Sequence, residues 1–100
     1  MTGTRTAALP EVPTLIEAGL SGVDVAGWHG IVAPKGTDPA LVTRINQAVV
    51  QVLQLAEVRE RLTALGIEAV EGSPEALAAK MRADTARWAP VIQRTGMQAD

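Results

Sequence analysis

The chain has 100 residues, with 9 Lys and Arg against 11 Asp and Glu, one His and no Cys, so it is long enough for one small domain and too short for two. A net charge of −2 offers no basic stripe to nucleic-acid phosphates, and the apolar runs are far shorter than the roughly 20 residues that cross a bilayer. Of the 47% hydrophobic residues, 17 are alanine and only two are aromatic, so the core is thin and a partner surface is expected.

The first third of the chain predicts a short helix and then a strand. Residues 13–19 begin with proline and end with glycine, which is the usual asymmetry of helix ends. Residues 23–34 alternate and contain β-branched side chains, so they are the best strand candidate. Gly27 and Gly30 within them indicate a bulge or the close approach of another backbone.

The middle of the chain is predicted to be helical. Asp38-Pro39 predicts a helix start, because the aspartate accepts a first-turn N–H and proline has none to leave unpaired. One face of this helix is apolar and comprises Leu41, Ile45, Ala48, Val49 and Val52. The helical pattern continues until Gly66, which is expected as a left-handed cap. It fits one helix or two, and the helix formers Leu55 and Ala56 favour an uninterrupted one.

The last third predicts a short strand at residues 67–71 and a final helix. Ser73-Pro74 repeats the pattern of a cap followed by proline, and this helix is expected to stop at Gly96 with a kink at Pro90, which lacks a backbone N–H. The order of elements is that of an α/β layer. Because two strands are too few for a stable sheet, we expect a larger protein or a second copy to complete it.

Few residues suit catalysis or metal binding. His29 is the single histidine and would have to serve as the base for any nucleophile. Ser21 and Ser73 fall at a turn and at a predicted cap, where local backbone hydrogen bonds are the simpler interpretation. No second His and no Cys can join His29 as a metal ligand, and no loop has phosphate-binding spacing. We therefore predict no catalytic residue, no metal and no cofactor.

The stretch Gly27-Trp28-His29-Gly30 is the best candidate for a ligand-binding site. Neighbouring side chains on a strand point to opposite faces, so one of Trp28 and His29 can be buried while the other faces a cleft. Trp28 is either a core anchor or the apolar wall of a ligand site. We select all four residues as ligand-binding candidates, with Trp28 as the wall and His29 as a hydrogen-bond donor.

Several short motifs occur in an order that is more specific than any one of them. They are Leu9–Thr14, Glu17–Leu20, Gly27–Gly30, Ala33–Thr37, Val58–Leu62, Leu65-Gly66, Ser73–Glu75, Trp88 and Val91-Ile92. Together they resemble the C-terminal part of the Bug (TctC-like) solute-binding proteins of tripartite tricarboxylate transporters. The resemblance covers nearly the whole chain.

This resemblance implies a periplasmic protein of two α/β lobes that closes on a small carboxylate and presents it to the membrane subunits of a transporter. Residues 1–100 would be a single fragment: a partial lobe of a periplasmic-binding-protein-like α/β fold, with helices packed on a small sheet that a partner copy completes. No signal peptide is recognised at Met1-Thr2-Gly3, which resembles an interior Val-Thr-Gly of the family. The family's glycine-rich carboxylate-binding loop and its second-lobe loop have no matching positions in this sequence.

Three positions depart from the family pattern. His29 stands where Tyr or Phe is usual, Leu55-Ala56 stands where Asp-Pro commonly starts a separate helix, and Pro90 interrupts a helix that the family generally continues. The first bears on ligand preference and the others on helix boundaries.

Two classes of function follow. In the first, the chain belongs to a solute-binding protein whose intact form captures tricarboxylates, dicarboxylates or amino acids without catalysis. In the second, it is a standalone interaction module that has lost ligand binding. We also expect a homodimer that exchanges elements through one long helix from Asp38 to Leu65.

Overall fold

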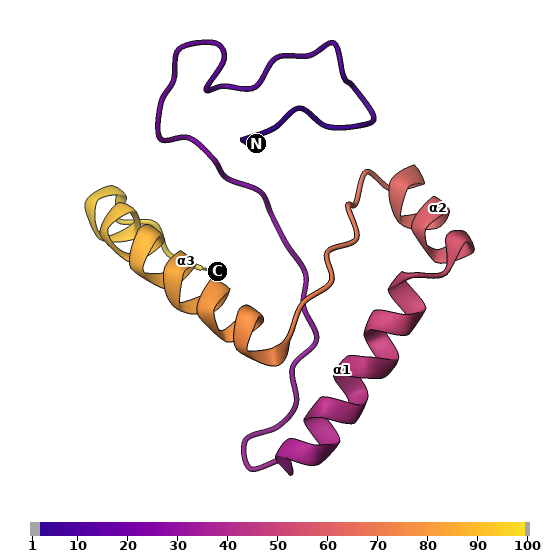
Figure 1. The fold of residues 1–100 in the computed structure, drawn as a ribbon. Helices are drawn as coiled ribbons and strands as arrows, with labels where there is room; N and C mark the ends of the chain where they lie inside the picture. Colours follow the sequence, from indigo (N-terminus) through magenta and orange to yellow (C-terminus); the bar gives the residue numbers. More distant parts are fainter. Residues whose placement is uncertain (1–2, 100) are drawn as a thin grey trace.

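The computed structural model describes residues 3–99, which contain three helices joined by turns and extended segments (Figure 1). Helix α1 spans Pro39–Leu53, α2 spans Ala56–Ala64 and α3 spans Pro74–Thr95. In Figure 1, the extended chain before α1 runs between α1 and α3, and residues 3–22 form a loop at one end of the molecule. Among residues 3–99, no helix is both long enough and apolar enough to span a bilayer.

Helix α1 begins where the sequence predicts. The Asp38 side chain accepts a hydrogen bond from the Ala40 N–H at 2.9 Å, and Pro39 occupies the first turn, where its missing N–H costs nothing. Both local signals are therefore confirmed.

The expected uninterrupted helix across Leu55 and Ala56 is wrong. Helix α1 ends at Leu53, and Leu55 leaves the helical region with ψ of 129° before α2 begins. Glu71 stabilises the corner, because it accepts hydrogen bonds from Gln54 at 3.3 Å and from Arg59 at 2.6 Å. Propensity is a weak signal, and these tertiary contacts override it here.

Helix α3 also keeps its predicted ends. Ser73 Oγ accepts the Ala76 N–H at 3.1 Å, and Gly96 closes the helix with φ of 67°, a left-handed conformation that glycine adopts without strain. The helix continues through Pro90. Gly66 likewise follows α2 with φ of 72°, as predicted.

The predicted α/β fold, with helices packed on a small sheet, is wrong for the described residues. Residues 23–34 and 67–71 are not helical, and no strand forms anywhere in residues 3–99. A ladder requires two strands about 4.8 Å apart. These segments instead attach to different helices: Trp28 of the first bonds to Asp84 of α3, whereas Glu71 of the second accepts from Arg59 of α2.

The predicted short helix at residues 13–19 is also wrong, because this stretch forms turns. The Ala18 N–H donates to the Thr14 carbonyl at 3.0 Å, which is a single helical turn. The Leu20 N–H then reaches back to the Leu15 carbonyl, and Gly19 adopts φ of 99°. This geometry is typical of a helix C-terminus, so the helical conformation ends after a single turn.

The three helices enclose no apolar core within residues 3–99. Thr14 is the one buried residue among them, and large apolar side chains stay exposed along the helices and extended segments. The solvent-accessible surface is 8354 Å², against about 5,400 Å² expected for a compact protein of 10.5 kDa. The radius of gyration is 16.6 Å, against about 13 Å for a compact 100-residue domain. The arrangement is open and leaves large apolar side chains exposed.

Candidate functional site

The candidate ligand-binding stretch Gly27–Gly30 lies in the extended segment beside α3. Trp28 donates its indole Nε1–H to Asp84 Oδ2 at 2.6 Å, and its side chain is 40% exposed. It is therefore not the buried core anchor that the sequence allowed. One edge of the ring is fixed to α3 while much of its surface stays accessible.

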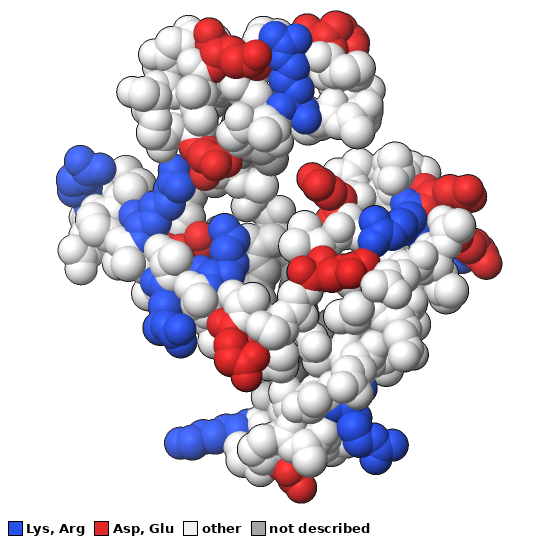
Figure 2. All heavy atoms as spheres, viewed as in Figure 1, with Lys and Arg blue, Asp and Glu red and all other residues white. Residues whose placement is uncertain are grey.

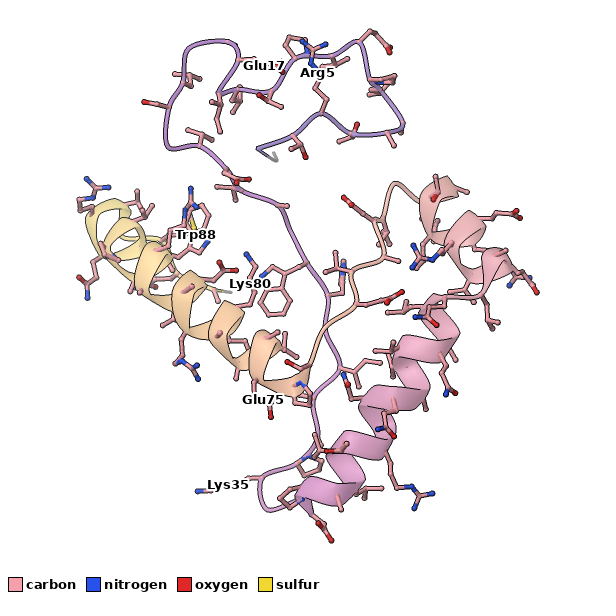
Figure 3. All side chains as sticks on the ribbon, in the orientation of Figure 1. Arg5, Glu17, Lys35, Glu75, Lys80 and Trp88 are labelled. Carbon is pink, nitrogen blue, oxygen red and sulfur yellow. The ribbon has the colours of Figure 1, made fainter. Side chains whose placement is uncertain are left out.

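Asp84 is held through both of its oxygens. Its Oδ1 accepts from Lys80 Nζ at 3.2 Å, and Lys80 lies on the side of α3 that faces the extended segment (Figure 3). The hydrogen bond from Trp28 is the main cause of a lowered Asp84 pKa, and Lys80 lowers the pKa further. Asp84 is thus an ionised acceptor at neutral pH.

Arg87 fixes the same segment a few residues earlier. Its Nη1 donates to the Asp24 carbonyl and its Nη2 to the Gly22 carbonyl, both at 3.0 Å. The guanidinium carbon also lies 5.9 Å from the centre of the Trp88 ring, within range of a cation–π contact. Arg87 is therefore committed to backbone and ring contacts.

The two glycines of the stretch have different surroundings. A Cβ at Gly30 would lie 3.3 Å from side-chain carbons of both Leu77 and Trp28, so a larger residue there would displace its neighbours. A Cβ at Gly27 would have no atom within 4 Å. His29 is exposed. The neighbours of Gly30 are thus side chains of the chain itself, and the close approach of another backbone expected at these glycines stays a prediction.

Open hollows lie on α1 and on α3. A hollow of about 310 Å³ is apolar and is lined by Ile31, Ala48, Val49, Val52 and Leu53. Another of about 350 Å³ follows α3 and is lined by Asp84, Thr85, Trp88, Ala89 and Ile92. Charged side chains of both signs are interspersed over the face seen in Figure 2, so no single-sign patch marks a site there. Within residues 3–99, no group of three potential ligands could hold a metal ion.

Sequence reasoning missed the residues of α3 that attach the extended segment: Asp84 bonds to Trp28, Arg87 bonds to Gly22 and Asp24, and Lys80 bonds to Asp84. Lys80, Asp84 and Arg87 follow one another at steps of four and three, which places them on one helix face. That spacing is a visible signal, but a charged helix face usually contacts only solvent. The partners of Asp84 and Arg87 lie 56 to 65 residues earlier in the chain, a relationship that no local pattern reveals.

The chain was compared with known proteins. Residues 1–97 match the model of the tripartite tricarboxylate transporter family receptor, TctC. A "UPF0065 protein in tcbD-tcbE intergenic region" of a Pseudomonas species is 41% identical over 93 residues, which cover 92% of this chain and 28% of that protein. "Protein BugT" of Bordetella pertussis is 33% identical over 92 residues, with the same two coverages. No solved structure matches.

These relatives are much longer than the chain, so the match covers only part of each of them. A third protein, the "UPF0065 protein in the TAR-I ttuE-ttuC' intergenic region" of Agrobacterium vitis, is 35% identical over 98 residues, which cover 95% of this chain and again 28% of the relative. The chain thus spans less than a third of the length of these relatives. The family match confirms the resemblance noted from the motifs: the chain belongs to the TctC family of tripartite tricarboxylate transporter receptors.

Proposed function

We propose that this chain is the C-terminal segment of a periplasmic solute-binding receptor that captures small carboxylates and passes them to the membrane subunits of a tripartite tricarboxylate transporter. The family match over residues 1–97 carries the proposal. The receptor binds and releases its solute without chemical change. Because the chain covers 28% of each of three relatives, delivery to the membrane subunits is a function of the longer protein, and this chain supplies part of the ligand contacts.

The stretch Gly27-Trp28-His29-Gly30 is the part of the site that we assign to this chain. The indole N–H of Trp28 is already donated to Asp84, so the ring offers a ligand its apolar face. His29 is exposed and supplies the hydrogen-bond donor for a carboxylate. The two residues then divide the apolar and polar contacts of a small carboxylate between them.

Fluorescence of Trp28 tests this assignment. In a Trp88→Phe variant Trp28 is the single tryptophan, and we expect its emission to change saturably when citrate, malate or glutamate is added. The matched control is Trp28→Phe, which keeps Trp88 and should give no saturable change. Sodium chloride at equal ionic strength controls for screening. If none of the three carboxylates produces a saturable change in Trp88→Phe, the assignment of carboxylate binding to this stretch is wrong.

The second candidate function is a homodimeric interaction module without ligand binding. The observation that favours it is the open fold, with roughly 3,000 Å² more surface than a compact chain of this mass. That excess is enough to supply one side of an obligate interface of about 2,000–5,000 Å². Such a dimer would not use a long exchanged helix, because α1 and α2 are separate. The apolar face of α1 is the better contact surface.

Light scattering after size exclusion decides between monomer and dimer. A mass near twice 10.5 kDa, lowered by Ile45→Glu on the apolar face of α1, would support the module. Arg44→Glu, a charge change at a neighbouring exposed position, is the matched control. A mass of 10.5 kDa throughout the micromolar concentration range would reject the homodimeric module.

A further inference from the structure

The extended segment that contains Gly27–Gly30 belongs to no sheet, so no ladder determines its orientation. Side chains of α3 attach to it instead. Asp84 accepts from the Trp28 indole, and Arg87 donates to two carbonyls at the start of the segment. The position of the candidate ligand stretch therefore depends on these side-chain contacts.

Asp84 makes the shortest of the hydrogen bonds between α3 and this segment. Its hydrogen bond with Trp28 measures 2.6 Å and those from Arg87 measure 3.0 Å, and all three are charge-assisted because one partner in each is ionised. Lys80 bonds to the other carboxylate oxygen, which opposes rotation of the carboxylate away from the indole. The side chain of Asp84 is 25% exposed, half the exposure of its partner Lys80.

Asp84 does not suit direct contact with a carboxylate solute, because two carboxylates repel each other. The nearby cations do not reverse this, since Lys80 is paired with Asp84 and Arg87 donates to backbone carbonyls. Asp84 instead controls the orientation of the Trp28 ring relative to α3. It holds the N–H edge against α3, while Trp28 remains 40% exposed.

We infer that Asp84 is a positioning residue for ligand recognition, orienting the indole of Trp28 through the hydrogen bond between its carboxylate and the indole N–H. The inference rests on the proposed function, because Trp28 is the apolar wall in that proposal. Arg87 has a secondary role and fixes the segment at residues 22–24. A positioning residue acts on the ligand through Trp28 and makes no contact with the ligand itself.

The experiment compares Asp84→Ala with Asp84→Asn in the Trp88→Phe background. Without ligand, Asp84→Ala should move the Trp28 indole N–H resonance upfield, accelerate its exchange with solvent and lower the fluorescence anisotropy. Asp84→Asn keeps an acceptor oxygen of similar shape and should restore part of each signal. Citrate binding should weaken about threefold to tenfold in Asp84→Ala, as expected for a lost hydrogen bond, and less in Asp84→Asn.

Two controls separate positioning from general damage. Glu75→Gln removes a carboxylate from the start of the same helix (Figure 3) and should leave the indole signals unchanged. Helical content by circular dichroism should match in all variants, which excludes loss of α3 as the cause.

Each outcome has a separate meaning. Unchanged indole signals in Asp84→Ala would overturn the positioning role, whatever citrate does. Altered indole signals with an unchanged citrate affinity would show that the contact does not serve recognition, which also overturns the inference. Altered indole signals together with no citrate, malate or glutamate binding in the Trp88→Phe parent would refute the proposed function while leaving the contact between Asp84 and Trp28 established.

Discussion

Thr14 and Glu17 cap each other across one turn of backbone. The Thr14 N–H donates to Glu17 Oε2 at 2.8 Å, and the Glu17 N–H donates to Thr14 Oγ1 at 3.1 Å. Arg5 adds its Nε–H to the same carboxylate at 2.9 Å and bonds to the Pro10 carbonyl (Figure 3). This is the reciprocal pattern of a capping box, used here to close a loop around Thr14, the most buried residue described.

The first prediction concerns the ionisation of Glu17. Hydrogen bonds from Arg5 and from the Thr14 N–H lower its pKa from 4.5 to about 2. Because the pKa falls on folding, the contribution of Glu17 to stability is complete above about pH 4.5 and is lost as the pH falls toward about 2. An NMR titration of the Glu17 carboxyl carbon checks this pKa directly.

Substitution of Arg5 tests the cause of that shift. Arg5→Gln should raise the pKa of Glu17 toward 4.5, because the largest contribution to the shift is removed. Arg5→Lys keeps the charge without the guanidinium geometry and should give an intermediate value. A titration midpoint near 4.5 in the unsubstituted chain would contradict the ion pair altogether.

The second prediction concerns the start of α2. Leu55 occupies its N-cap position and supplies no side-chain hydrogen bond. Leu55→Asp should stabilise the helix by about 1 kcal/mol, because an aspartate accepts a first-turn N–H. A more negative ellipticity at 222 nm would show this gain in helix stability. Leu55→Ser separates capping from charge, and Leu55→Ala should give no gain; equal effects of Asp and Ala would rule capping out.

The third prediction concerns the contact between α1 and the segment before α3. Asn46 donates its side-chain N–H to the Gly72 carbonyl at 2.7 Å. Asn46→Ala should lower the free energy of unfolding by about 0.5–1.5 kcal/mol, the net value of one hydrogen bond. Gln47→Ala, at the adjacent exposed position, should change it by less than about 0.5 kcal/mol. Thermal unfolding followed by circular dichroism measures both, and equal losses would refute the specific role of Asn46.

The fourth prediction concerns Pro90 inside α3. Proline there removes one helical hydrogen bond, so Pro90→Ala should stabilise the helix by about 1–3 kcal/mol and yield a new amide at position 90 that exchanges slowly. Pro74→Ala is the matched control, because Pro74 is at the start of the same helix, where proline is well tolerated. A lower helical content in Pro90→Ala would contradict this prediction and would mean that the helix requires a bend that proline favours. The kink that the sequence predicts at Pro90 stays a prediction.

Much of what the sequence predicted correctly was local. The caps at Asp38 and Ser73 each join a side chain to a backbone N–H two or three residues away, and the left-handed glycines at positions 66 and 96 donate to carbonyls three or four residues earlier. Such contacts form whatever the rest of the chain does. The order of the motifs was also sufficient to identify the family.

The sequence alone therefore determined where α1 and α3 begin, where α2 and α3 end, and to which family the chain belongs. The tertiary structure decided the break at Leu55, the absence of a sheet in residues 3–99 and the attachment of Trp28 to Asp84. Each of these depends on partners 12 to 56 residues away, such as Glu71 for Arg59 and Asp84 for Trp28. Propensity and periodicity describe only neighbours within a turn or two, so contacts over such separations become visible only when the chain is folded.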